Sequence, residues 1–124
     1  MVNGKVVVVV VQDLFFSVRM TDSLRAMGHQ VLSVADEREL RVLLGSTRPN
    51  LVILDLQASG VTALGIVTAV NDLVKGRPVP VLAFGPHTDL KKRSEAMQAG
   101  CRRVVAKSMI YAELPRLVDS MLRA

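Results

Sequence analysis

The sequence predicts an α/β fold in which a parallel sheet of five strands is covered by helices on both faces. The first strand is the run of six valines at Val6–Val11, because an amphipathic helix would interrupt it with polar residues and a half-exposed strand would alternate. Strand and helix patterns then alternate with short connections, which is typical of a doubly wound sheet. No linker, repeat or low-complexity tract interrupts the 124 residues, so we expect a single domain over residues 1–124.

Short apolar segments between the helix patterns predict the other four strands. These segments are QVLSV from Gln30, RPNLVILDL from Arg48, VPVLAF from Val79 and RVVAK from Arg103. The segment that ends near Asp55 is almost wholly apolar, so we expect its strand to be buried on both faces. The pattern does not distinguish the strand order 2-1-3-4-5 from a Rossmann-type order.

Apolar spacing and end signals predict five helices. Four of them carry the apolar sets Phe16, Met20, Leu24, Met27; Leu40, Leu43, Leu44; Ile66, Val70, Leu73, Val74; and Leu114, Leu117, Val118, Met121, Leu122, and the polar-rich fourth helix covers Leu90–Met97. The first four helices are predicted to stop near Gly28, Gly45, Gly76 and Gly100. Asp36 and Glu39 form a capping box for the second helix. Because Pro115 is tolerated only in a first turn, the last helix should start near Tyr111 or Ala112.

Composition and charge limit the classes of function. Aromatic residues make up 3% of the chain and Trp is absent, so large platforms for stacking bases are missing. The one cysteine, Cys101, excludes an internal disulfide and a zinc knuckle. The valine run is shorter than the ~20 apolar residues of a membrane span, and no signal-peptide pattern surrounds it, so we expect a cytoplasmic protein without membrane contact. Most of the net charge of +5 lies after Pro86.

Three ionisable residues follow the predicted first, third and fifth strands: Asp13, Asp55 and Lys107. Ligands of open α/β sheets bind at the carboxyl ends of the strands, where Asp13 and Asp55 converge if their strands are neighbours. Two such carboxylates repel each other unless a cation lies between them, and a few oxygen ligands near the surface suit hydrated Mg²⁺. The alternative is that each aspartate only caps the following helix, but the coincidence of three residues favours a site. No G-x-G-x-x-G or P-loop motif is present.

Over nearly its full length the chain resembles the receiver domain of two-component response regulators, which has the CheY-like fold. The resemblance rests on VVVQDL, RPNLVILDL, Gly60, VPVLAFGPHTD and MQAGCRRVVAKS. It implies the flavodoxin-like strand order 2-1-3-4-5, with Asp55 as the phosphoacceptor. It also implies that Asp13, Asp55 and the carbonyl of Gln57 bind Mg²⁺, and that Lys107 pairs with the phosphoryl oxygens. A receiver domain is a module of signal transduction, so the resemblance implies protein–protein interaction and not an enzyme.

Four positions depart from the receiver pattern. Gln12 stands where receivers have a second acid, so we expect Mg²⁺ to bind weakly. Gly85 and Val104 replace the hydroxyl and the aromatic residue of the usual switch, and Ser108 replaces the proline that follows the lysine in a cis bond. A non-proline cis bond costs about 2.5–4 kcal/mol, and a hydrogen bond to a charged group contributes about 1.5–3 kcal/mol. We therefore expect an atypical receiver, or pseudo-receiver, in which phosphorylation couples poorly to conformation.

Basic residues beyond the fourth strand are candidate contacts for a protein partner, either a kinase or a downstream signalling protein. They are Lys91, Lys92, Arg93, Arg102 and Arg103. In receivers the fourth helix, fifth strand and fifth helix form the usual partner and dimer face, so a homodimer through this surface is also open. An ordinary solvated helix face is an equal alternative, and nucleic acid is less favoured because no recognition-helix motif accompanies the charge. We expect Cys101 to be buried and His29 and His87 to be exposed.

Two other functions stay open from the sequence. The first is a working phosphoacceptor that a histidine kinase phosphorylates on Asp55. The second is a flavodoxin-like small-molecule binder, which the lack of a phosphate-binding loop after the first strand disfavours.

Overall fold

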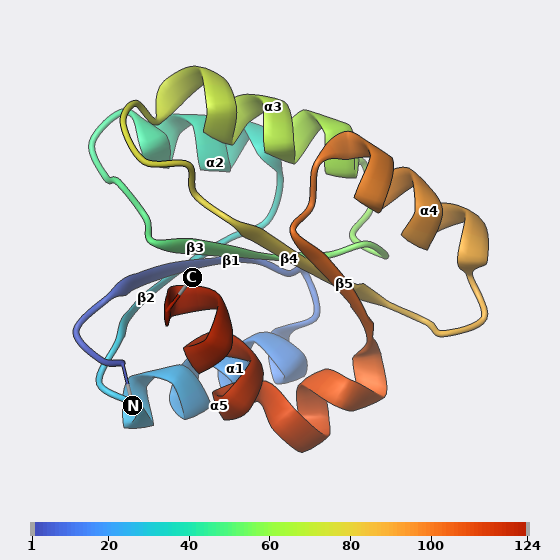
Figure 1. Ribbon diagram of the computed structural model, residues 1–124, viewed down its shortest axis with the longest axis horizontal. Coiled ribbons are helices and arrows are strands. Elements are labelled where there is room, and N and C mark those ends of the chain that lie inside the picture. Colours follow the sequence, from blue (N-terminus) through green and yellow to red (C-terminus); the bar gives the residue numbers. More distant parts are fainter. Residues whose placement is uncertain (1, 124) are drawn as a thin grey trace.

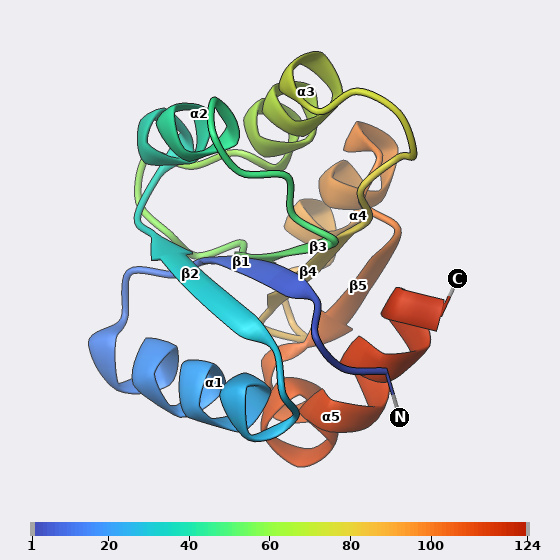
Figure 2. The same ribbon diagram turned by 90° about the vertical axis from the view of Figure 1, so that its left-hand side faces the viewer.

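The computed structural model describes residues 2–123 and has the predicted parallel sheet, with strand order β2-β1-β3-β4-β5. The strands are β1 Val6–Val10, β2 Gln30–Val34, β3 Leu51–Asp55, β4 Val81–Gly85 and β5 Arg103–Ala106. The helices are α1 Leu14–Ala26, α2 Glu37–Leu44, α3 Ala63–Leu73, α4 Leu90–Ala99 and α5 Lys107–Arg123. Helices α2, α3 and α4 cover one face of the sheet, and α1 and α5 cover the other (Figures 1 and 2). None of the described helices is long and apolar enough to cross a membrane.

The valine run supplies side chains to both faces of the sheet. Val7 and Val9 belong to the apolar layer beneath α1 and α5, whereas Val8 and Val10 belong to the layer beneath α2, α3 and α4. All four side chains are fully buried. Because successive side chains of a strand point to opposite faces, a central strand covered on both sides must be apolar at every position. This explains why the first polar residues, Gln12 and Asp13, come only after the strand has ended.

Side-chain caps and one glycine fix several helix ends where they were predicted. The Asp36 carboxylate accepts a hydrogen bond from the Glu39 N–H at 2.9 Å, and the Glu39 carboxylate accepts one from the Ala35 N–H at 3.2 Å. This reciprocal pair confirms the predicted capping box of α2. Helix α4 ends at Ala99 and is capped by Gly100, whose φ of 111° lies in the left-handed region that favours glycine.

The end of α3 and the start of α5 differ from the prediction. Helix α3 ends at Leu73, because Val74 is already extended and Arg48 donates to the carbonyls of Lys75 and Arg77 in the following loop. In a longer helix, backbone N–H groups would donate to these carbonyls; in the loop, the Arg48 guanidinium donates to them instead.

Helix α5 begins at Lys107, directly after β5, and not near Tyr111 or Ala112. Its backbone is non-helical at Glu113, where φ is −137°, so a kink divides it into two helical pieces. Pro115 therefore lies in the first turn of the second piece, as its missing N–H requires.

His29 is buried, so the expectation that it is exposed was wrong. Only 4% of the residue is accessible to solvent. Its Nδ1 accepts a hydrogen bond from the Lys5 N–H at 3.3 Å, and its buried Nε2 has no partner among residues 2–123. The neighbouring sequence gives no apolar pattern that would reveal this, because His29 is buried by the tertiary fold at the start of β2.

Burial of His29 predicts a loss of stability in mild acid. Burial lowers the pKa of His29 below its ordinary 6.5; the Asp119 carboxylate opposes this shift and Lys5 adds to it. The unfolded chain therefore binds the proton more readily, and the free energy of unfolding should decrease as the pH falls below 6.5. Urea unfolding at pH 7.5 and pH 5.5 measures the decrease, which should be smaller in His29→Asn. An equal decrease in both proteins would assign the pH dependence to other groups.

Candidate functional site

The carboxyl ends of β1, β3 and β4 meet at one edge of the sheet and bring the predicted acidic residues together. Strand β3 lies between β1 and β4, with Leu54 beside Val10 and Asp55 beside Phe84. Asp55 is the last residue of β3 and is only 6% exposed. Its Oδ1 accepts a hydrogen bond from the Gln57 N–H at 2.9 Å.

The capping alternative is right for Asp13 and wrong for Asp55. Asp13 is the N-cap of α1, and its Oδ1 accepts a hydrogen bond from the Phe16 N–H at 3.1 Å. Helix α3, which follows Asp55, is instead capped by Thr62, whose hydroxyl accepts from the Gly65 N–H at 3.0 Å. Asp55 therefore has no helix-capping role that would explain a carboxylate at the end of a buried strand.

Burial makes the ionised form of Asp55 unfavourable. It raises the pKa of the Asp55 carboxyl above its ordinary value, and the nearby Asp13 carboxylate acts in the same direction. The Gln57 N–H, Lys107 and Lys92 oppose this rise without cancelling it. No salt bridge reaches Asp55 among residues 2–123. The site thus holds a carboxylate whose charge an added cation would stabilise.

Replacing Asp55 with Asn should stabilise the fold or leave its stability unchanged at neutral pH. With a raised pKa, the proton of Asp55 favours the folded state, and this contribution to stability is lost as the pH rises through the folded-state pKa. An asparagine removes the charge and keeps an oxygen that can accept from the Gln57 N–H. Thermal unfolding at pH 7 should show an equal or higher Tm for Asp55→Asn. A decrease equivalent to the ~1 kcal/mol of a lost cap would contradict this reading.

Lys107 lies near Asp55 but does not pair with it. It is the first residue of α5, and its Nζ lies 4.8 Å from the centre of the Phe16 ring. The Phe16 ring also contacts Phe84 and Tyr111, at centroid distances of 5.1 and 4.8 Å. The ammonium of Lys107 is therefore held by a neutral aromatic face in a cation–π contact, close enough to the acidic site to lower the pKa of Asp55.

Gln12 connects three loops at the edge of the site. Its Nε2 donates to the carbonyls of Ala35 and Ser59, at 3.1 and 2.9 Å, and its Oε1 accepts from the Ser59 N–H at 2.9 Å. These bonds join the loop after β1 to the loops after β2 and β3. A carboxylate cannot donate hydrogen bonds, so a second acid at this position could not form the two bonds to carbonyls. Replacing the second acid with Gln12 therefore removes one negative charge from the site and also adds hydrogen bonds that hold the loops together.

The residues of this edge provide a small set of hard oxygen ligands. Asp13 and Asp55 each accept a hydrogen bond from a backbone N–H through Oδ1, and these two bonds do not involve Oδ2 of either carboxylate. The Oε1 of Gln12 already accepts from Ser59. Within residues 2–123 no three His, Cys, Asp or Glu side chains gather as a metal-binding group. Two carboxylates with the backbone carbonyl of Gln57 fit a cation that keeps several waters, such as Mg²⁺.

The two positions of the usual switch carry no group that could act as one. Gly85 ends β4, and a Cβ at this position would meet the Leu56 Cβ at 3.4 Å, which is ordinary contact. Val104 is half-buried in β5 and packs on the apolar layer beneath α2, α3 and α4. Ser108 lies in the first turn of α5, and the backbone of residues 2–123 contains no cis peptide bond.

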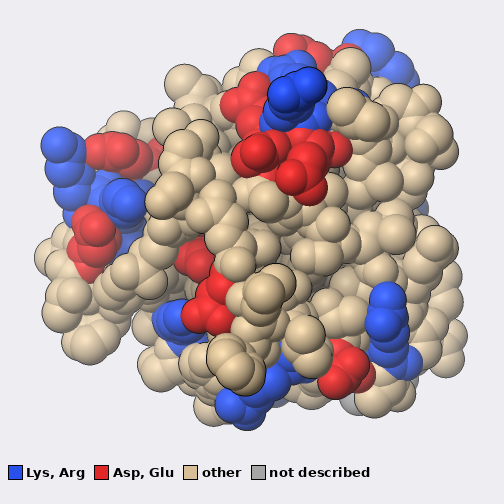
Figure 3. Space-filling model, turned by 180° about the vertical axis from the view of Figure 1, so that it is seen from behind, with Lys and Arg blue, Asp and Glu red and all other residues tan. Residues whose placement is uncertain are grey.

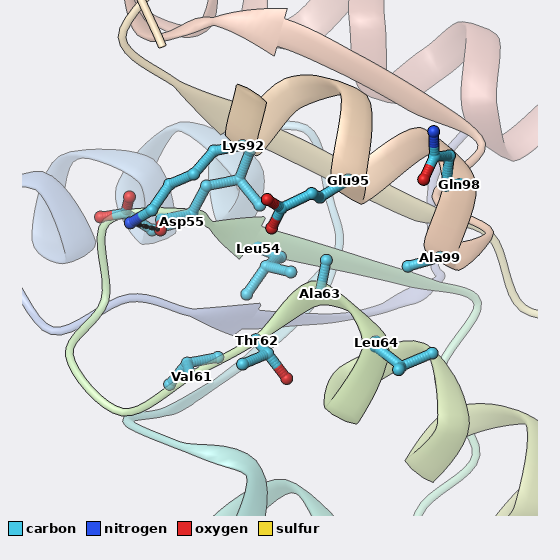
Figure 4. A pocket seen from close by; sticks show the side chains of 11 residues that line it. Leu54, Asp55, Val61, Thr62, Ala63, Leu64, Lys92, Glu95, Gln98 and Ala99 are labelled. Atoms are coloured by element: carbon cyan, nitrogen blue, oxygen red, sulfur yellow. Dashed lines mark hydrogen bonds between the residues drawn. The ribbon is translucent and has the colours of Figure 1, made fainter. Parts of the chain in front are cut away.

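A pocket of about 490 Å³ opens between α3 and α4 beside Asp55. Its apolar wall is formed mainly by the residues Leu54, Val61, Ala63, Leu64 and Ala99. Lys92 and Glu95 of α4 also line it, and Figure 4 shows the Lys92 side chain extended toward Asp55. The Nζ of Lys92 donates to the Leu56 carbonyl at 3.1 Å. The sequence had placed Lys92 only among candidate partner contacts, and no sequence signal shows which way a long helical side chain turns.

Four of the five predicted basic contacts are exposed. Lys91, Lys92, Arg102 and Arg103 are exposed, whereas Arg93 is partly buried and donates to the Val104 carbonyl at 3.4 Å. On the face drawn in Figure 3, acidic and basic side chains are intermixed and separated by uncharged surface. The exposed members of the predicted set are therefore Lys91, Lys92, Arg102 and Arg103, and Lys92 also lines the Asp55 pocket.

Two further groups have the predicted surroundings. Cys101 is 4% exposed, and burial raises the pKa of its thiol to about 11. The thiol is therefore protonated at neutral pH and unsuited to act as a nucleophile. His87 is exposed in the loop after β4.

Comparison with known sequences places most of the chain in one family. The model of the response regulator receiver domain matches residues 7–119. The transcriptional regulatory protein PrrA of Mycobacterium leprae is 26% identical over 98% of this chain, which spans 52% of PrrA. The polar-differentiation response regulator DivK of Brucella anthropi is 23% identical over 92% of this chain and 91% of DivK. An uncharacterized 76.5 kDa protein of Thiocystis violacea is 26% identical over 94% of this chain, which spans 17% of that protein.

Solved structures show the same fold. The receiver domain of a sensor histidine kinase from Pseudomonas aeruginosa, which has a magnesium ion in its active-site cleft, superposes with a TM-score of 0.84 at 21% identity. That match covers 98% of this chain and 99% of the other. A response regulator receiver protein from Burkholderia phymatum superposes with a TM-score of 0.76 at 29% identity, covering 95% and 94% of the two chains. The family match and the strand order β2-β1-β3-β4-β5 agree, and a flavodoxin-like binder gains no support. The chain belongs to the response regulator receiver domain family, whose members are generally non-enzymatic modules of two-component signalling.

Proposed function

We propose that this chain is an atypical receiver domain, which recognises a signalling protein without needing the usual phosphorylation switch. The observation that carries the proposal is the identity of two residues: Gly85, the last residue of β4, and Val104, within β5. One has no side chain and the other has a half-buried apolar side chain, so neither offers a side-chain hydrogen bond to an occupied acidic site. A ligand shifts a conformational equilibrium only if it binds one state better, and here the usual contacts of the second state are absent.

Within this proposal Asp55 remains the position where a phosphoryl group would attach. Asp13, Asp55 and the Gln57 carbonyl would hold Mg²⁺, which would supply positive charge beside the phosphoryl oxygens, and Lys107 would pair with those oxygens. The magnesium ion in the related Pseudomonas receiver supports this assignment. Gln12 contributes no charge, so the Mg²⁺ site should be weak. The chain would act as one receiver-like domain over residues 1–124 and would not turn over a substrate of its own.

The partner surface in this proposal is formed by α4, β5 and α5. Its exposed basic residues favour an acidic patch on a kinase or on a downstream protein; they are Lys91, Lys92, Arg102 and Arg103. A second copy of the chain could use the same surface. Nucleic acid is not favoured, because the chain has no Trp and only 3% aromatic residues to stack on bases.

The second candidate is an ordinary phosphoacceptor receiver, which a histidine kinase phosphorylates on Asp55. Asp55 itself favours it, because the carboxylate is buried, has no ion-pair partner among residues 2–123 and lies near two lysines.

Treatment with beryllofluoride and Mg²⁺, followed by amide NMR spectra, separates the two candidates. If the receiver is atypical, amides near Asp55 and Gln57 move, while those of Arg103–Val105 in β5 move no more than with Mg²⁺ alone. Large shifts through β5 and into the second helical piece of α5 would show that the ordinary switch operates. Intact-mass measurement after acetyl phosphate treatment, with Asp55→Asn as the control, reports whether Asp55 accepts a phosphoryl group.

A further inference from the structure

Lys92 belongs to helix α4 but lies in the acidic site. Its Nζ donates to the carbonyl of Leu56, the residue directly after Asp55, at 3.1 Å. Two carboxylates, Asp55 and Glu95, line the same pocket, yet Lys92 forms no salt bridge among residues 2–123 (Figure 4). Its charge is therefore held by a neutral oxygen and not neutralised by an acid.

Lys107 is held in a comparable way on a different element. Its Nζ contacts the face of the Phe16 ring, and it too forms no salt bridge among residues 2–123. Both lysines are close enough to act electrostatically on Asp55. Neither forms a salt bridge with its carboxylate among residues 2–123. Two ammonium groups with only neutral partners thus flank one buried carboxylate. An anionic group attached to Asp55 would bring negative charge and oxygen atoms into their reach.

We propose that Lys92 is a second cationic ligand, beside Lys107, for a phosphoryl group attached to Asp55, and that it links this group to helix α4. The inference rests on the proposed role of Asp55 as phosphoacceptor. A phosphoryl group carries a charge of about −1.5 to −2 and three acceptor oxygens, and the lysine ammonium has three donors on a flexible stem. The ammonium would turn from the Leu56 carbonyl to a phosphoryl oxygen.

This contact would take the place of the missing hydroxyl. Gly85 at the end of β4 offers no side chain to the site, whereas Lys92 lies in the first turn of the helix that follows. A displacement of its Nζ would act on the backbone of that turn, which the Asp89 carboxylate anchors by accepting from the Lys92 N–H at 3.1 Å. The response would be confined to the start of α4 and would leave β5 unchanged.

Beryllofluoride titrations in the presence of Mg²⁺ test the inference in the full chain. The variants are Lys92→Met, which keeps most of the length of the side chain without its charge, and Lys91→Met, which makes the same charge change at the neighbouring residue. We expect Lys92→Met to weaken beryllofluoride binding about tenfold, which is ~1.4 kcal/mol, and Lys91→Met to change it less than twofold. The amides of Leu90–Arg93 should shift in the parent protein and not in Lys92→Met, and Lys92→Arg should restore part of both effects.

Binding within twofold of the parent in Lys92→Met, or unmoved amides of Leu90–Arg93 in the parent, would overturn the inference. Spectra of the free variants establish that each is folded before the titration. If the parent protein forms no adduct at Asp55, the inference also fails, whereas the proposed recognition of a partner without phosphorylation stands.

Discussion

Replacing Gln12 with Asp should increase the affinity for Mg²⁺ by about tenfold or more. The change adds a carboxylate to a site that holds only Asp13, Asp55 and a backbone carbonyl. Two unit charges 4 Å apart attract by ~4 kcal/mol at the effective dielectric constant of ~20 near a protein surface, and a tenfold change in affinity needs only ~1.4 kcal/mol of this. Titration with Mg²⁺ followed by the amide shifts of Asp55 and Gln57 measures the affinity.

The same variant should be less stable in the absence of Mg²⁺. Gln12 donates to the carbonyls of Ala35 and Ser59, and an aspartate cannot. Each bond contributes about 0.5–1.5 kcal/mol, and the value at this exposed position should lie at the lower end. Gln12→Asn is the matched control, because it shortens the side chain equally without adding charge. If the Asp and Asn variants bind Mg²⁺ with equal affinity, the weak site has a cause other than the missing charge.

Reversing the charge of Lys91 and Arg103 together should reduce partner affinity by about a hundredfold. Both side chains are exposed, and they come from α4 and β5 of the proposed partner surface. Like charges placed against each other across an interface cost several kcal/mol, and a hundredfold loss corresponds to ~2.7 kcal/mol. The partner, a kinase or a downstream protein, is first identified by crosslinking. Isothermal titration with the purified partner then measures the affinity of each variant. Lys92 is left intact, because changing it would also disturb the Asp55 pocket.

The matched control reverses Arg25 and Arg38, which are exposed on α1 and α2 and give the same change in net charge. This control variant should bind the partner normally. Affinity of the parent protein should also fall as salt is added, since exposed charges are screened over ~8–10 Å at physiological ionic strength. Equal losses in the two double variants would mean that net charge, and not this surface, determines binding.

The fold and the acidic residues were predictable because they depend on local signals. The valine run marks a strand covered on both faces, and caps such as Asp36 with Glu39 act within one turn of a helix. Asp13, Asp55 and Lys107 each stand at the end of a strand, so the parallel topology alone brings them to one edge. The identity of the strand order came from the family resemblance and not from the pattern.

The parts of the site that the sequence did not predict depend on contacts between distant residues. Gln12 was read only as a missing charge, because its partners Ala35 and Ser59 lie 23 and 47 residues away in the chain. Lys92 was predicted to be a surface charge and it is exposed, but its bond to the Leu56 carbonyl was not predicted, because four rotatable bonds let a lysine reach either solvent or the pocket. His29 was expected on the surface, since a single histidine between a glycine and a strand carries no burial signal.

The central claim is that this receiver recognises its partner without a phosphoryl group on Asp55. The most direct test compares partner affinity of the parent protein with that of Asp55→Ala by isothermal titration, without any phosphodonor. The account predicts that the two dissociation constants agree within twofold, because the exposed basic side chains of α4 and β5 are in place without a phosphoryl group on Asp55. A loss of tenfold or more in Asp55→Ala, in a variant that remains folded, would show that Asp55 controls recognition and would contradict the account.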